Sequence, residues 1–269
     1  MTTLSAAPPA MRFCSLGSGS SGNATVVEAR SGSTTSRVLI DCGFSLRELE
    51  SRLQRAGLDV DDLDAVFVTH EHSDHIGCAT TLARRHALPL WMSRGTWRAI
   101  GEPEVPEGLL NFARDGQAIA IGDLQLEPCT VPHDAQEPLQ LRICDGARHL
   151  GVLTDIGSIT PHVVGHLQRC DALLLECNHD FELLAQSRYP ASLKARISGR
   201  LGHLSNDTAT QILAACMHDG LQHLVAAHLS KENNRPDLAR AALGRACGGS
   251  GRDIVVADPK LGFDWLNLA

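Results

Sequence analysis

Apolar runs divide the chain into strand-like and helix-like segments that alternate along its length. The run at residues 65–69 has the length and apolar character of a short buried strand. Ser45, with Glu48 three positions later, is typical of a capping box and predicts a helix that reaches about residue 56. A further helix is expected between the 65–69 run and residue 86. Three earlier runs, bounded by turns rich in glycine and serine, are expected to be strands over residues 12–16, 24–28 and 37–41.

The second half repeats this alternation. Several strands are expected between residues 117 and 153, and two more apolar strands at 172–176 and 221–227, with a last strand at 254–257. Helices are expected after Pro161 and over residues 180–186, 192–198, 206–218 and 236–245. This order is compatible with two packed sheets that carry helices on their outer faces, although the pattern alone does not choose that fold.

Composition favours one large folded domain. Apolar residues make up 43% of the 269 positions, which is enough for a sizeable core. We predict a single domain over residues 11–269, preceded by a flexible tail over residues 1–10 that is rich in small residues and proline. The tail has neither the basic start nor the apolar stretch of a secretory signal.

Cysteine content predicts a cytoplasmic protein, and the charge predicts a soluble one. The net charge of −7, from 24 basic and 31 acidic residues, suits a soluble protein and weighs against non-specific binding of nucleic acid. The nine cysteines are odd in number and include no Cys-x-x-Cys pair, so neither a disulfide framework nor a four-cysteine zinc site is expected. No apolar run approaches the roughly 20 residues that span a bilayer.

Candidate chemistry is concentrated directly behind the 65–69 run. Residues 69–77 read Thr-His-Glu-His-Ser-Asp-His-Ile-Gly, which places His70, His72, Asp74 and His75 in one loop. Imidazole nitrogen suits zinc, and carboxylate oxygen suits harder ions such as manganese. The ordinary alternative is a solvated polar loop, but chance rarely groups these residues behind a buried strand. We therefore predict a metal site here.

One loop cannot supply two metal ions with all their ligands. His133, Asp155 and His228 each follow an apolar strand-like run, as side chains at one edge of a sheet would. A single histidine at a strand end is more often structural. The cluster at residues 70–75 makes a ligand role the better interpretation of all three.

The sequence Thr-His-x-His-x-Asp-His resembles the signature of the metallo-β-lactamase superfamily. The resemblance implies a four-layer αβ/βα sandwich, two sheets flanked by helices, that holds two divalent ions, zinc or manganese. It assigns His70, His72 and His133 to one ion, Asp74, His75 and His228 to the other, and Asp155 to both. A hydroxide shared by the two ions would be the nucleophile. Asp74 could also orient this nucleophile, and Asp41 would support the ligands from behind.

Several chemistries share such a site, and the fold cannot choose among them. Asp155 disfavours the true β-lactamases, which usually lack that ligand, and His72 disfavours the di-iron redox branch, which usually has glutamate there. Asp155 and His228 are too close in sequence to enclose the inserted domain of the RNA-processing branch.

Later motifs resemble those of ribonuclease Z-type phosphodiesterases and, more closely, the YycJ/WalJ-like 5′–3′ exonucleases. These motifs lie at residues 16–23, 131–134, 176–180, 202–206 and 228–234. The resemblance implies a DNA exonuclease in which His203 assists the leaving group.

Further residues are candidates for substrate contact, each with an ordinary alternative. The glycine–serine run at 17–22 offers backbone N–H groups to a phosphate, or it is a simple turn. His203 could donate a proton, or it could be a surface or supporting residue, and the same choice applies to His179. Basic side chains near the 202–206 motif could contact phosphate, or they could form a solvated helix face. The full set of predicted substrate contacts is Ser20, Ser21, Gly22, Asn23, Lys194, Arg196, Arg200 and Asn206.

Three other functions remain open from the sequence. One is a thioester or ester hydrolase like glyoxalase II, which uses the same metal ligands but has no reason to carry the 176–180 and 202–206 motifs. Another is a phosphodiesterase for small cyclic nucleotides. A third is a non-catalytic metal-binding module.

Overall fold

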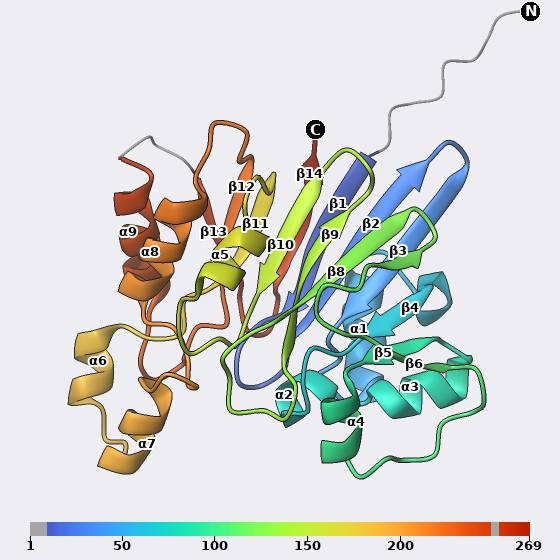
Figure 1. Cartoon of the computed structure of the whole chain (residues 1–269), viewed down its shortest axis with the longest axis horizontal. Coiled ribbons are helices and arrows are strands. Elements are labelled where there is room, and N and C mark those ends of the chain that lie inside the picture. The colour runs from blue at the N-terminus through green and yellow to red at the C-terminus, as the bar shows by residue number, and fades with distance from the viewer. Residues whose placement is uncertain (1–9, 249–252) are drawn as a thin grey trace, which may run out of the picture.

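Two mixed β-sheets of seven strands each form the centre of the molecule (Figure 1). The computed structural model describes residues 10–248 and 253–269. The predicted tail therefore lies, apart from Ala10, outside the described residues, and the division into a tail and one domain stays a prediction. No helix among the described residues is long and apolar enough to cross a membrane.

The first sheet combines antiparallel hairpins with a parallel half. Strands β1, β2 and β3 pair antiparallel, whereas β3 to β6 run parallel to their neighbours. In spatial order its strands are β14 (Phe263–Leu268), β1 (Ala10–Gly17), β2 (Ala24–Ser31), β3 (Thr34–Ile40), β4 (Ala65–Phe67), β5 (Leu90–Met92) and β6 (Leu110–Phe112).

The second sheet has the same two-part construction. Strands β10 to β13 are parallel, and β7 to β10 are antiparallel. In spatial order its strands are β13 (Ile254–Val256), β12 (His223–Ala227), β11 (Ala172–Glu176), β10 (His149–Leu153), β9 (Leu139–Cys144), β8 (Leu124–Thr130) and β7 (Ile119–Ile121).

Helices cover the outer face of each sheet and complete four layers. Buried residues of α1 and α3 join the core outside the first sheet, and those of α5, α8 and α9 join the core outside the second. This arrangement confirms the predicted αβ/βα sandwich. The helices are α1 (Leu46–Arg55), α2 (Ser73–Ile76), α3 (Ala79–His86), α4 (Arg94–Ala99), α5 (Pro161–His166), α6 (Phe181–Gln186), α7 (Ala191–Ile197), α8 (Asn206–Cys216) and α9 (Pro236–Ala246), with a 3₁₀ turn at Val60–Asp62.

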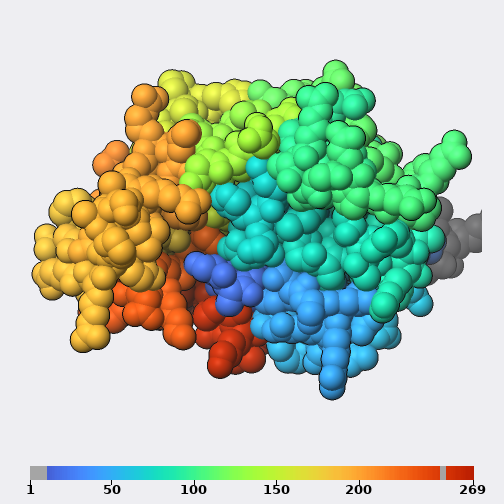
Figure 2. All heavy atoms as spheres, turned by 90° about the horizontal axis from the view of Figure 1, so that it is seen from below, coloured from blue at the N-terminus to red at the C-terminus, as the bar shows by residue number. Residues whose placement is uncertain are grey.

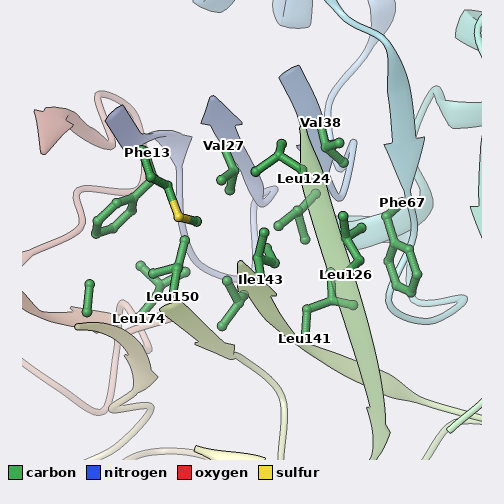
Figure 3. Close-up of a cluster of buried hydrophobic side chains, with 14 of the residues drawn as sticks. Phe13, Val27, Val38, Phe67, Leu124, Leu126, Leu141, Ile143, Leu150 and Leu174 are labelled. Atoms are coloured by element: carbon green, nitrogen blue, oxygen red, sulfur yellow. The ribbon is translucent and has the colours of Figure 1, made fainter. Parts of the chain in front are cut away.

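Alternation along the strands explains how one sheet serves two cores. In β2, Val27 belongs to the core between the sheets, whereas the neighbouring Val26 belongs to the core under α1 and α3. Successive strand residues point to opposite faces, so a sheet packed on both sides needs apolar residues at nearly every position. Figure 3 shows the core between the sheets, where Phe13, Val27, Val38 and Phe67 of the first sheet meet Leu124, Leu126, Leu141, Ile143, Leu150 and Leu174 of the second.

The structure corrects three details of the sequence prediction. The last strand is β14 rather than the predicted 254–257 segment, and it pairs with β1 at the edge of the other sheet. Ser45 accepts the N–H of Glu48, but the Glu48 side chain binds Arg52 instead of returning to close a capping box. The helix expected after the metal loop is broken into α2 and α3 at Gly77, where an added Cβ would lie 2.2 Å from the Cys42 carbonyl oxygen.

The parallel strands end at one common edge, where the candidate site residues begin. Asp41 follows β3, Asp155 follows β10 and His228 follows β12. All three have left-handed backbone conformations, with φ of 61°, 56° and 54°. Such values are strained for residues other than glycine and persist where the surrounding structure requires them. The strain therefore accumulates at the edge where the polar side chains converge.

Candidate metal centre

The loop after β4 and the loop after β8 together form a three-histidine group. His70, His72 and His133 have nitrogen atoms that all lie within 4.8 Å of one another. Nε2 of His70 is 3.0 Å from Nδ1 of His72, which is 3.3 Å from Nε2 of His133. Burial is the main cause that lowers the pKa of both His70 and His133, so these imidazoles are neutral and can act as ligands.

A second group lies beside the first. Asp74, His75 and His228 have ligand atoms within the same 4.8 Å limit, and so do His70, His75 and Asp155. Asp155 is almost wholly buried, with 2% of its surface exposed. Its Oδ1 is 3.9 Å from Nε2 of His133 and 3.4 Å from Nδ1 of His228. The carboxylate of Asp155 therefore stands between the two groups, at the place that a ligand shared by two ions would take.

One contact tests whether these residues fit a metal ion. Nδ1 of His75 is 2.8 Å from Oδ2 of Asp41, and an ionised carboxylate can only accept, so Nδ1 carries a proton and Nε2 is the nitrogen left to act as a ligand. Nε2 lies 2.8 Å from Oδ2 of Asp155, a buried oxygen. Burial alone would lower the pKa of His75, but Asp155 and Asp41 raise it well above its ordinary value, so the two carboxylates favour a positive charge here, either a proton on Nε2 or a metal ion. The residues fit a divalent ion at this position.

The electrostatics of His228 lead to the same conclusion. Burial alone would lower its pKa, but the carboxylates of Asp155, Asp74 and Glu176 outweigh burial and raise the pKa to about 10. The buried carboxylates thus favour positive charge strongly at this point, and two divalent ions would supply it.

Glu176 holds two of the site histidines from behind and was not predicted as a site residue. It ends β11 and is completely buried. Oε1 accepts from Nδ1 of His203 at 2.7 Å and from Nδ1 of His228 at 3.2 Å. Burial raises its pKa, but His203 and His228 together lower it to about 2. A carboxylate that ends a wholly apolar strand is the sequence signal that could have identified it, because Asp155 and His228 follow apolar strands in the same way.

A cavity of about 250 Å³ opens above these groups. It is seen from the side shown in Figure 2, with the gold α6–α7 segment at one flank and the blue loop after β1 near the centre. Two of the three predicted catalytic residues, Asp74 and His203, line it. The complete lining is Ser20, His72, Asp74, Asp134, Asp155, Asn178, Tyr189, Leu193, Arg196, Ile197, Gly202, His203, His228 and Ser230.

His179 takes a different place from His203. It is 2% exposed, it is absent from the lining of this cavity, and burial lowers its pKa to about 4. Its backbone carbonyl accepts the N–H of Asn206, the first residue of α8. This places His179 among the supports of the 202–206 segment, away from the cavity surface.

The predicted substrate contacts in the glycine–serine run are only partly at the cavity. Ser20 lines it, and Ser21 lines a neighbouring cavity of about 660 Å³ that also contains Lys231 and Arg240. Asn23 is buried, and its Nδ2 lies 3.2 Å from the Asp74 carbonyl oxygen. Gly22 is also buried, and an added Cβ would overlap the ring of Phe44. The structure thus brings Ser20 to the site and uses Asn23 to brace the metal loop.

The predicted basic contacts are likewise divided. Arg196 lines the cavity and pairs with Asp134 at 2.6 Å, whereas Lys194 donates to the Ala185 carbonyl oxygen at 2.6 Å. Arg200 is exposed and does not line the cavity. Asn206 is buried and exchanges hydrogen bonds with Asn234.

Comparison with known proteins agrees with this geometry. A family model described as a β-lactamase superfamily domain matches residues 36–228. Over 259 residues the chain is 33% identical to exodeoxyribonuclease YycJ of Bacillus anthracis, covering 93% of this chain and 97% of the relative. It is 33% identical over 255 residues to exodeoxyribonuclease WalJ of Streptococcus pneumoniae, covering 92% of this chain and 93% of the relative. The chain belongs to the metallo-β-lactamase superfamily, within the YycJ/WalJ family.

Solved structures of the superfamily share the fold. The metallo-β-lactamase fold protein YhfI of Bacillus subtilis superposes with a TM-score of 0.71 at 19% identity, covering 96% of this chain and 99% of that chain. At this identity the similarity concerns the arrangement of the sheets and helices. The function must be argued from the site.

Proposed function

We propose that this member of the YycJ/WalJ family is a metal-dependent exodeoxyribonuclease that removes nucleotides from the 5′ end of DNA. The observation that carries the proposal is the gathering of all seven predicted ligands in overlapping clusters beside one cavity, in a chain that matches two exodeoxyribonucleases over more than nine-tenths of its length. The choice of the 5′ end rests on the motifs at residues 16–234.

Two divalent ions, zinc or manganese, are the cofactors. His70, His72 and His133 would hold one, Asp74, His75 and His228 the other, and Asp155 would contact both. When bound, such ions act as Lewis acids that activate water near neutral pH and stabilise the charge that develops on a phosphate.

Asp74 is placed to position the attacking water. It lines the cavity with 19% of its side chain exposed, and its Oδ2 is 3.4 Å from Nε2 of His228. The backbone around it is fixed, because its carbonyl oxygen accepts the N–H of Asn23 at 2.8 Å. The Asp74 carboxylate accepts the proton of the water as the water oxygen attacks phosphorus.

His203 is placed to serve the leaving group. It lines the cavity, and Glu176 engages its Nδ1 at 2.7 Å, so Nε2 is the nitrogen that remains for substrate. The bond between phosphorus and the 3′ oxygen of the terminal nucleotide breaks, and that oxygen takes a proton from His203. The products are a nucleotide with a free 3′ hydroxyl and a shortened strand with a new 5′ phosphate.

A negative net charge is compatible with this substrate. The ions add positive charge where the phosphate sits, and Arg196 places a guanidinium on the cavity wall. The overall charge of −7 argues against a long basic track for DNA, so we expect action at chain ends rather than processive travel.

The test is hydrolysis of a 5′-phosphorylated DNA duplex, labelled at either end, by metal-free protein resupplied with manganese or zinc. We expect stepwise release of nucleotides from the 5′ end, and a loss of at least about a hundredfold in the His203→Ala variant. An RNA duplex and a thioester are run in parallel.

Three other outcomes would contradict the proposal, each in a different part. Release from the 3′ end contradicts the polarity, and faster cleavage of RNA contradicts the choice of DNA. Turnover of the thioester without DNA cleavage would assign the chain to glyoxalase II-like chemistry while leaving the metal ligands in place.

A further inference from the structure

One helix beside the metal centre has apolar residues that no core explains. No residue of α7 is buried. Its large apolar residues Leu193 and Ile197, and Tyr189 just before it, are half-buried and belong to none of the three hydrophobic cores among the described residues. Helices ordinarily turn their apolar side chains toward a core. Here all three side chains line the metal-site cavity instead.

Tyr189, Leu193 and Ile197 form an apolar wall of the cavity, and two hydrogen bonds tie its helix to the neighbouring segments. Lys194, in the middle of α7, donates to the Ala185 carbonyl oxygen near the end of α6. At the C-terminal end of α7, the N–H of His203 donates to the Ile197 carbonyl oxygen at 2.8 Å. Gly202 allows this close approach, since an added Cβ there would lie 2.2 Å from the Ile197 carbonyl oxygen. The wall is thus fixed to the residue proposed to serve the leaving group.

The remainder of the cavity is polar. Ser20, Ser230 and Asn178 contribute hydroxyl and amide groups, and the metal ligands contribute imidazole and carboxylate. A ligand that fits must therefore present a phosphate to the ligands and a flat apolar face to α7. A nucleotide has both.

We propose that Tyr189 stacks against the base of the 5′-terminal nucleotide, with Leu193 and Ile197 extending the apolar surface. The inference rests on the proposed function and specifies its substrate contact. We assign the terminal base because the wall adjoins His203. In the proposed function His203 gives a proton to the 3′ oxygen of the terminal nucleotide, so this nucleotide lies beside the wall. Stacking on an aromatic ring accepts every base, because every base has a π face.

The other aromatic residues do not compete for this role. Trp91 packs against the core between the sheets, and Trp97 packs against the core under α3. Phe181 on α6 is 63% exposed and does not line the cavity. Tyr189, the single tyrosine of the chain, is the aromatic residue other than histidine in the described lining. Phe181 therefore provides a matched control on the same segment.

The experiment compares a normal 5′-phosphorylated duplex with one whose terminal nucleotide is abasic, using metal-loaded wild type, Tyr189→Phe, Tyr189→Leu and the control Phe181→Leu. We expect Tyr189→Leu to raise KM for the normal duplex about tenfold with little change in kcat, and Tyr189→Phe to resemble wild type. On the abasic duplex the KM of wild type should rise to that of Tyr189→Leu, whose own KM should not rise further. Phe181→Leu should behave as wild type on both.

Two results would overturn the inference. One is an unchanged KM of Tyr189→Leu for the normal duplex. The other is a rise in the KM of Tyr189→Leu on the abasic duplex that is as large as the rise shown by wild type. A binding measurement separates this failure from failure of the proposed function. Metal-loaded protein is titrated with thymidine 5′-monophosphate and with 2-deoxyribose 5-phosphate. Preference for the nucleotide that depends on Tyr189 supports the base site even if DNA is not cleaved, and equal affinity for the two probes refutes it.

Discussion

Replacing Glu176 by glutamine removes the charge behind two site histidines while preserving the size of the side chain. Glu176 is completely buried and accepts four hydrogen bonds. Oε1 binds Nδ1 of His203 at 2.7 Å and Nδ1 of His228 at 3.2 Å. Oε2 binds the backbone N–H groups of Ile156 at 3.0 Å and Leu204 at 3.1 Å. A glutamine has one acceptor oxygen, so it can satisfy only one of these pairs.

If the amide oxygen keeps the backbone pair, its NH₂ group faces the two imidazoles. Each Nδ1 must then become an acceptor, which moves the proton of His228 to Nε2 and removes the lone pair needed for a metal ion. Losing the carboxylate partner of a metal-binding histidine costs about 10–100-fold in affinity, or roughly 1.4–2.7 kcal/mol. We predict a loss in this range for one of the two ions, and a larger loss of nucleotide release because His203 changes as well.

The assay is calorimetric titration of metal-free protein with zinc, alongside its thermal unfolding. Glu182→Gln, at an exposed position on α6, is the matched control and should bind both ions as wild type does. A folded Glu176→Gln variant that binds both ions with wild-type affinity would refute the proposed tautomer of His228.

Three further predictions concern stability and the metal loop. Burial raises the pKa of Glu28, but hydrogen bonds from Arg12 and Arg37 outweigh it and lower the folded-state pKa to about 2, below the ordinary 4.5. The stabilisation is therefore complete above about pH 4.5 and is lost as pH falls toward 2, by at most about 3 kcal/mol, and Glu28→Gln should lack this part of the pH dependence of unfolding. Gly43→Ala should destabilise the fold by about 1–3 kcal/mol and weaken metal binding, because its Cβ would lie 1.8 Å from the Asp74 carbonyl oxygen; an unchanged melting temperature and metal affinity would contradict this. Asp74→Ala should reduce turnover by at least about a hundredfold while the metal-free protein unfolds at the wild-type temperature, and turnover near wild type would contradict the assignment of the second ion.

The cluster of candidate metal ligands could be located from the sequence because its segments stand beside buried apolar runs. The sequence around His70 and the runs before Asp155 and His228 mark strand ends, and parallel strands place their carboxyl ends at one edge. The four-layer arrangement followed from the resemblance and not from periodicity, since strands that are apolar on both faces do not indicate how two sheets pack.

Contacts made between distant segments were beyond the sequence. Tyr189 lies in a polar stretch, and only the fold shows that it faces the metal centre. Asn23 was expected to contact substrate, but the turn after β1 brings it against the backbone of Asp74. Strand β14 was missed because residues 263–268 pair with β1, at the opposite end of the chain.

The central claim is that DNA hydrolysis depends on two ions held by the seven ligands. Its most direct test is titration of metal-free protein with manganese, or with zinc, while nucleotide release from a 5′-phosphorylated duplex is followed against the number of ions bound per chain. We predict no release without metal and full activity only when two ions are bound. Release by metal-free protein, or full activity with a single ion, would contradict the claim.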